Sequence, residues 1–281
     1  MISILGGLGA ALAWTVTSLT AAQASRLIGP WTTLAWVMLT GLVIVGPFVL
    51  AEGKPSALDG GAVGWLALAG AGNVGGLLLV YTGMRLGKVG VVAPISSSEG
   101  AVAAVIAVAA GEHLGVATGI ALAVVVVGVV LAARAPATGE EERDDPRAVL
   151  LALAAACAFG SSLYATARAS VDLPVMWAVL PPRLLGVALV TLPLVAARRF
   201  RVTREALPLV LASGGAEVAG FVSYAIGARH GIAVTAVLAS QFAGLSALAA
   251  GLLFRERLGR VGIAGVIVIA AGVAAVSALR A

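Results

Sequence analysis

Two glutamates lie in the middle of long apolar stretches. Glu99 occurs in PISSSEG, directly after three serines, and Glu217 occurs in SGGAEVAGFVSY. Low dielectric disfavours the charged form of a carboxyl group, so a glutamate in such a stretch can take up and release a proton near neutral pH. If a proton and a solute compete for the same carboxylate, binding of one expels the other. The alternative for each is a permanently neutral carboxyl group, or a pair with Arg183 that holds helices together.

Further polar residues share helix faces with these glutamates. Residues three, four and seven apart lie on one face of an α-helix, which groups Ser213 and Tyr224 with Glu217, and Ser96 with Glu99. Asn73 is a third polar residue within an apolar run. The predicted solute-binding set comprises Glu99, Glu217, Asn73, Arg183, Trp14, Ser96, Ser161, Tyr164, Tyr224, Ser240 and Gln241.

The composition requires a lipid environment for these residues. Of the 281 residues 60% are hydrophobic and only 11% are charged, and the mean hydropathy is +1.07. Such values are far outside the range of water-soluble domains. The formal charge of +5 comes from basic residues in short gaps between apolar runs, not from a basic stripe, so nucleic acid is not an expected partner. We therefore expect a protein of the bilayer.

Few residue types here support catalysis, a metal or a cofactor. One cysteine, Cys157, cannot form an internal disulfide, and His113 and His230 have no metal-ligand spacing with it. The sequence contains no phosphate-binding loop, no H-E-x-x-H and no Ser/His/Asp set. Ala22 and Ala24 resemble a signal cleavage site, but the basic residues that precede such a signal are missing. We expect a protein with no metal, cofactor or enzymatic activity, whose first apolar segment is retained.

Ten segments have the roughly 20 apolar residues that a helix needs to cross a bilayer. Charges, prolines and glycine clusters mark their ends. The predicted spans are 3–22, 30–51, 61–83, 89–110, 115–133, 148–167, 175–197, 206–228, 232–254 and 261–279.

A long hydrophilic stretch, RAPATGEEERDDPR, divides these spans into two sets of five. Displacing the sequence by 144 positions pairs Arg85 with Arg229 and Glu112 with Glu256, without a gap. Five is an odd number, so the second copy enters the membrane from the side opposite the first. The fold class is thus an all-α membrane protein with two inverted five-helix repeats around a central cavity, typical of secondary transporters. We divide the chain into a first repeat (1–133), a linker (134–147) and a second repeat (148–281).

Each repeat ends with a short motif between two apolar spans, Gly-Glu-x-Leu-Gly from Gly111 and Arg-Glu-x-Leu-Gly from Arg255. This pattern resembles the EamA domain of the drug/metabolite transporter superfamily, present twice. The resemblance implies that spans 1, 3, 4, 6, 8 and 9 line the cavity. An arginine early in the second helix of each unit is usual in the family; Arg183 matches it, whereas the first repeat has Leu39.

The motif glutamates themselves are expected to be structural. Glu112 lies in a turn, where a carboxylate is favoured by the exposed N–H groups at the start of the following helix. Glu256 occupies the same turn of the second repeat, and inversion sets the two on opposite faces of the membrane. Neither is therefore expected in a shared site.

The expected function is a proton-coupled exporter of small metabolites, amino acids or amphipathic cations in the plasma or inner membrane. The alternatives are an uncoupled exchanger of an anionic metabolite and a non-transporting accessory protein. Only four lysines and arginines lie on the side of the N-terminus and thirteen on the other, which predicts that both termini are outside. Glycine-rich helix faces could serve either the packing of helices within one chain or the interface of a homodimer.

Overall fold

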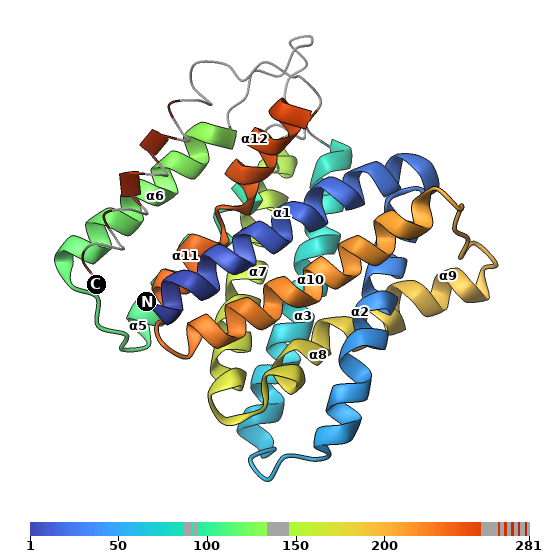
Figure 1. The fold of residues 1–281 in the computed structure, drawn as a ribbon, viewed down its shortest axis with the longest axis horizontal. Helices are drawn as coiled ribbons and strands as arrows, with labels where there is room; N and C mark the ends of the chain where they lie inside the picture. Colours follow the sequence, from blue (N-terminus) through green and yellow to red (C-terminus); the bar gives the residue numbers. More distant parts are fainter. Residues whose placement is uncertain are drawn as a thin grey trace.

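The computed structural model describes residues 1–86, 92, 95–133 and 146–253, and seven helical positions between 264 and 279. The elements are α1 (Ile2–Ile28), α2 (Pro30–Glu52), α3 (Gly60–Leu86), α5 (Glu99–Ala109), α6 (Val116–Ala133), α7 (Pro146–Asp172), α8 (Val175–Gly186), a π-helical turn (Val187–Thr191), α9 (Leu192–Ala196), α10 (Ala206–Ala228), α11 (Ile232–Ala239) and α12 (Phe242–Leu253). In the described ranges every regular element is helical (Figure 1).

Six of these segments are long and apolar enough to cross a bilayer on their own. They are α1, α2, α3, α7, α10 and the continuous run from α8 to α9. The expected linker residues 134–145 and most of the expected span 261–279 lie outside the described residues. The last two linker residues, Pro146 and Arg147, already belong to α7, because proline is readily accommodated in the first turn of a helix.

The fourth and ninth spans are not the continuous helices expected from the sequence. Turns at residues 97–98 and 240–241 interrupt them, and the described parts beyond the turns are α5 and α12. The hydroxyl groups of Ser98 and Ser240 donate to the carbonyl oxygens of Ile95 and Val237, at 2.7 and 2.8 Å. Serine side chains that bind nearby carbonyls compete with the helical ladder. The prediction of two unbroken helices was therefore wrong at these serines.

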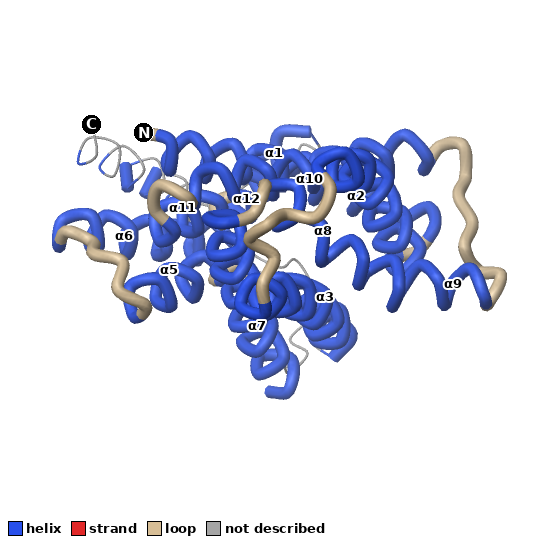
Figure 2. The backbone as a smooth tube through the Cα atoms, turned by 90° about the horizontal axis from the view of Figure 1, so that it is seen from below, coloured by secondary structure: helices blue, strands red, loops and turns tan. Residues whose placement is uncertain are grey.

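Two helix pairs form opposite sides of the molecule. Helix α1 packs along α10, and α3 packs along α7 (Figure 2). Glycines permit the close approach: a Cβ on Gly6 would lie 2.5 Å from the Cα of Gly227, and one on Gly72 would lie 2.6 Å from the carbonyl oxygen of Ala158. In a bilayer the hydrophobic effect does not drive helices together, so helices associate by close backbone packing, which small residues permit.

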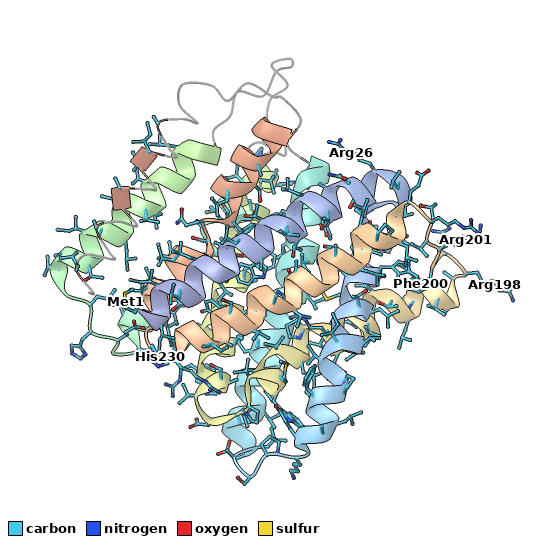
Figure 3. The ribbon with its side chains drawn as sticks, in the orientation of Figure 1. Met1, Arg26, Arg198, Phe200, Arg201 and His230 are labelled. Carbon is cyan, nitrogen blue, oxygen red and sulfur yellow. The ribbon has the colours of Figure 1, made fainter. Side chains whose placement is uncertain are left out.

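The helix ends gather on two faces of the molecule. One, here called the N-terminal face, holds Met1, the loop 53–59 and the turns 110–115 and 229–231. The other, here called the opposite face, holds Arg26 and the loop 197–205. Figure 3 shows Met1 and His230 along one edge and Arg26, Arg198 and Arg201 along the other.

Candidate functional site

A cavity of about 540 Å³ lies between the two helix pairs, in the middle of the molecule and toward the opposite face. It reaches Ala21 and Ser25 near the end of α1, Thr33 near the start of α2 and Tyr81 near the end of α3. None of its lining residues comes from the turns of the N-terminal face. The cavity is therefore closed toward the N-terminal face and extends toward the opposite face.

Glu99 and Glu217 both line this cavity. Glu99 is the first residue of α5, so the break in the fourth span sets it at the cavity wall, and it is 9% exposed. Glu217 is in the middle of α10, where it faces Glu99 from the other half of the chain. Within the described residues, neither carboxylate accepts a hydrogen bond or forms an ion pair. Their charges interact with each other, and that of Glu217 also interacts with Arg183.

Arg183 lies behind the cavity wall. It is 1% exposed, and its guanidinium group lies 4.5 Å from the centre of the Phe221 ring, which does line the cavity. Its Nη1 donates to the carbonyl oxygen of Val179 at 3.3 Å, while Nη2 has no partner in the described part of the chain. The cation thus acts on Glu217 by its field and on Phe221 by a cation–π contact, without contacting a solute in the cavity.

Trp14 lines the cavity and packs against three other rings. Its ring centroid lies 5.1 Å from that of Phe221 and 5.9 Å from that of Phe242, both edge-on, and 6.2 Å from that of Tyr224, which it stacks against. Gly220 leaves the room for the indole, because a Cβ there would overlap Nε1. The indole N–H has no acceptor among the described residues. The atom is itself buried, so the face of the indole and not its N–H lines the cavity.

The structure brings together five of the residues predicted for the site and separates the other six. Trp14, Asn73, Ser96, Glu99 and Glu217 line the cavity. The residues that do not are Arg183, Ser161, Tyr164, Tyr224, Ser240 and Gln241.

Most of the residues outside the cavity have structural partners. The Tyr224 hydroxyl donates to the carbonyl oxygen of Leu163 at 3.1 Å, and the Tyr164 ring packs edge-on against Trp65. Ser240 Oγ and Gln241 Nε2 donate to the carbonyl oxygen of Val237 at 2.8 and 3.0 Å. The predicted Ser161 does not line the cavity, whereas the next residue, Ser162, does.

Sequence reasoning missed the apolar part of the wall. Helix α2 contributes Thr33, Leu34, Val37 and Met38, although the second span was not expected to line the cavity. Aromatic rings from three other elements complete the wall: Tyr81, Phe159 and Phe242. An apolar side chain facing a cavity has the same sequence signature as one facing lipid, so no pattern in the chain distinguishes the two.

The described residues hold no group of three or more His, Cys, Asp or Glu side chains that could bind a metal ion. Glu112 does lie in the expected turn, but it caps a different helix from the one predicted. Its carboxylate accepts from the backbone N–H groups of Ile232 and Ala233 in α11, not from the start of α6. Glu256 lies outside the described residues.

Comparisons with known proteins agree with this architecture. A solved crystal structure has a TM-score of 0.81 to this chain, with 19% identity, and covers 99% of this chain and 96% of that one; at this identity it shows the fold alone. No curated protein sequence matches significantly. Residues 1–134 match the model of the EamA-like transporter family. This match over residues 1–134 places the protein in the drug/metabolite transporter superfamily.

Proposed function

We propose that the protein is a secondary active transporter that exports a small solute in exchange for protons. The observation that carries this proposal is one cavity faced by two carboxylates, Glu99 from the first half of the chain and Glu217 from the second. A volume of about 540 Å³ suits a small organic molecule, since such pockets span roughly 300–1,000 Å³. Repulsion between two carboxylates is relieved when either a proton or a cation enters, which makes the two ligands competitors.

Alternating access would arise from two inverted five-helix repeats, giving ten spans. Adding 144 to the bounds of α1 gives those of α7, and α3 and α10 correspond in the same register within two residues at each end. The helix packing follows the same correspondence. Helix α1 packs against α10, and their counterparts α7 and α3 pack against each other. The interruptions at 97–98 and 240–241 also fall within one residue of each other in this register. These correspondences favour a duplicated transporter in which the repeats move relative to one another around a fixed site.

Charge favours the opposite face as the cytoplasmic one. Six described arginines lie on that face: Arg26, Arg147, Arg198, Arg199, Arg201 and Arg204. The N-terminal face has fewer basic residues among those described. Cytoplasmic loops carry an excess of lysine and arginine. With this orientation in the cell membrane the termini are outside, and the cavity is open to the cytoplasm, ready to load a solute for export.

The cavity wall favours a solute that carries a positive charge and an apolar group. Among the described lining residues there are two carboxylates and several aromatic rings, but no lysine or arginine. Amphipathic amines and apolar amino acids have this chemistry. Exchange of an anionic metabolite would use a basic residue at the wall, and Arg183 is separated from the cavity by Phe221.

The test is transport by the purified protein in proteoliposomes with an imposed pH step. The panel should pair each aromatic amine with its neutral isostere, and should include apolar amino acids and a phosphorylated sugar. We expect uptake of the amine against its gradient when the pH step is present, and none of the neutral isostere. Equal transport with and without the pH step, or transport of the phosphorylated sugar alone, would contradict the proposal.

A further inference from the structure

The turn that carries Glu112 joins the two halves of the chain on the N-terminal face. Glu112 Oε2 accepts from the N–H of Ile232 at 3.0 Å and from the N–H of Ala233 at 3.1 Å, and Oε1 accepts from Ala233 at 3.3 Å. The positive φ of Gly111 (101°) turns the chain after α5, and the Glu112 N–H donates to the carbonyl oxygen of Ala107 at 2.9 Å. These two features direct the carboxylate toward α11.

Helix α11 has no side-chain cap from its own segment. It is preceded by Gly231, at a φ of 150° that only glycine adopts readily, and glycine has no side chain to accept a hydrogen bond. The first N–H groups of a helix need acceptors, and a carboxylate is the best suited because it also complements the helix dipole. Here that acceptor comes from the other half of the chain, 120 residues away.

The same turn contributes an apolar contact. Leu114 packs against the buried cluster that contains Ala233, as Ile232 does, and against the cluster that contains Val234 and Leu238. One side chain of the motif therefore binds the start of α11, and another packs along its first two turns. The motif residues singled out in the sequence are those that hold this junction.

Neighbouring contacts close the rest of the N-terminal face. Ser223 Oγ donates to the carbonyl oxygen of Gly6 at 3.0 Å, and Thr235 Oγ1 donates to that of Ser3 at 3.1 Å, which fixes α1 against α10 and α11. Among these contacts, Glu112 supplies a charged group that accepts hydrogen bonds across the two halves of the chain.

We propose that Glu112 is a positioning residue of the transport cycle, a latch whose carboxylate holds the N-terminal face closed by capping α11. This inference rests on the proposed function, since a latch has a role only where access alternates. Breaking the bond exposes two N–H groups and a carboxylate, which water solvates, so the latch can open and close reversibly.

The test measures which face of the protein a membrane-impermeant thiol reagent can reach, without any solute present. Cys157, the single cysteine, is first replaced by alanine. Ala167 is fully buried and lies on the same face of α7 as the cavity residue Leu163, one helical turn closer to the N-terminal face. It is the position of the first reporter, Ala167→Cys. The reporter Ala21→Cys lines the cavity and is open toward the opposite face.

With Glu112 present, we expect the reagent to label Ala21→Cys from the opposite face and to leave Ala167→Cys protected. Glu112→Ala should raise labelling of Ala167→Cys from the N-terminal face roughly 10- to 100-fold, the range expected for losing hydrogen bonds to a charged group. Glu112→Gln keeps an acceptor oxygen and should have a smaller effect. Glu52→Ala, which removes an exposed carboxylate on the same face, should leave Ala167→Cys protected.

A third reporter separates latch opening from unfolding. Ala35→Cys is fully buried in a different cluster, with Met38 and Val190, and should remain protected in every variant. Continued protection of Ala167→Cys in folded Glu112→Ala would overturn the proposal, as would an equal rise at Ala35→Cys. Because no solute is used, a failure of proton-coupled transport would leave this result unchanged, and the two proposals fail separately.

Discussion

Replacing Gly220 by alanine should disturb the cavity wall, because the added methyl group has no space. A Cβ at Gly220 would lie 2.5 Å from Cδ1 of Trp14 and closer still to its Nε1, whereas real Cβ atoms essentially never have contacts under 3.0 Å. The backbone of α10 is held by α1, so the indole must move. It would then leave its three ring partners, Phe221, Tyr224 and Phe242.

The size of the effect follows from those contacts. Aromatic pairs contribute about 0.5–1.5 kcal/mol each, so disturbing three of them costs about 1.5–4.5 kcal/mol. Overpacking of a core costs about 1–3 kcal/mol, so we expect a loss of about 2–3 kcal/mol in stability. Solute affinity should also fall, since Trp14 lines the cavity.

The assay is thermal unfolding of purified protein in detergent, together with the KM of solute transport in proteoliposomes. Gly215→Ala is the matched control on the same helix, where the nearest atom to an added Cβ is 4.0 Å away. Adding Trp14→Phe to Gly220→Ala should recover part of the loss, because the smaller ring vacates the position of Nε1. Equal stability and equal KM for Gly220→Ala and Gly215→Ala would refute the reasoning.

Three further experiments separate packing from charge. Gly6→Ala should destabilise the protein by about 1–3 kcal/mol, because the added Cβ would overlap the backbone of α10. Gly46→Ala, where an added Cβ has no atom within 4 Å, should leave the stability unchanged. Equal unfolding midpoints for the two variants would contradict this. Tyr224→Phe should cost about 1–3 kcal/mol in unfolding for the lost bond to Leu163 and leave the transport KM unchanged, because its hydroxyl group does not reach the cavity. Arg183→Leu and Glu217→Gln should be coupled by about 0.5–3 kcal/mol in a double-mutant cycle of unfolding; strict additivity would show that the two charges do not interact.

The sequence predicts the described spans well because hydrophobic length is a strong local signal. The bounds of α2 and α10 agree with the predicted spans within one residue. The broken fourth and ninth spans were missed because Ser98 and Ser240 are ordinary helix residues in a hydropathy plot, and only their hydrogen bonds to Ile95 and Val237 reveal the turns.

The candidate site was predictable only where a polar residue interrupts an apolar run. Glu99, Glu217 and Asn73 carry that signal, and all three line the cavity. Arg183 carries the same signal, but a single ring, Phe221, separates it from the cavity, and no sequence pattern encodes that separation. The capping of α11 by Glu112 joins residues 120 positions apart, so it required the tertiary structure.

Solute-driven proton movement discriminates proton exchange from every alternative. A pH-sensitive dye is trapped inside proteoliposomes, an aromatic amine that the wild type transports is added outside, and the internal pH is recorded for wild type, Glu99→Gln, Glu217→Gln and the double variant. We expect the wild type to move protons when the amine is added and the double variant to move none. An unchanged proton signal in the double variant would contradict coupling through these carboxylates.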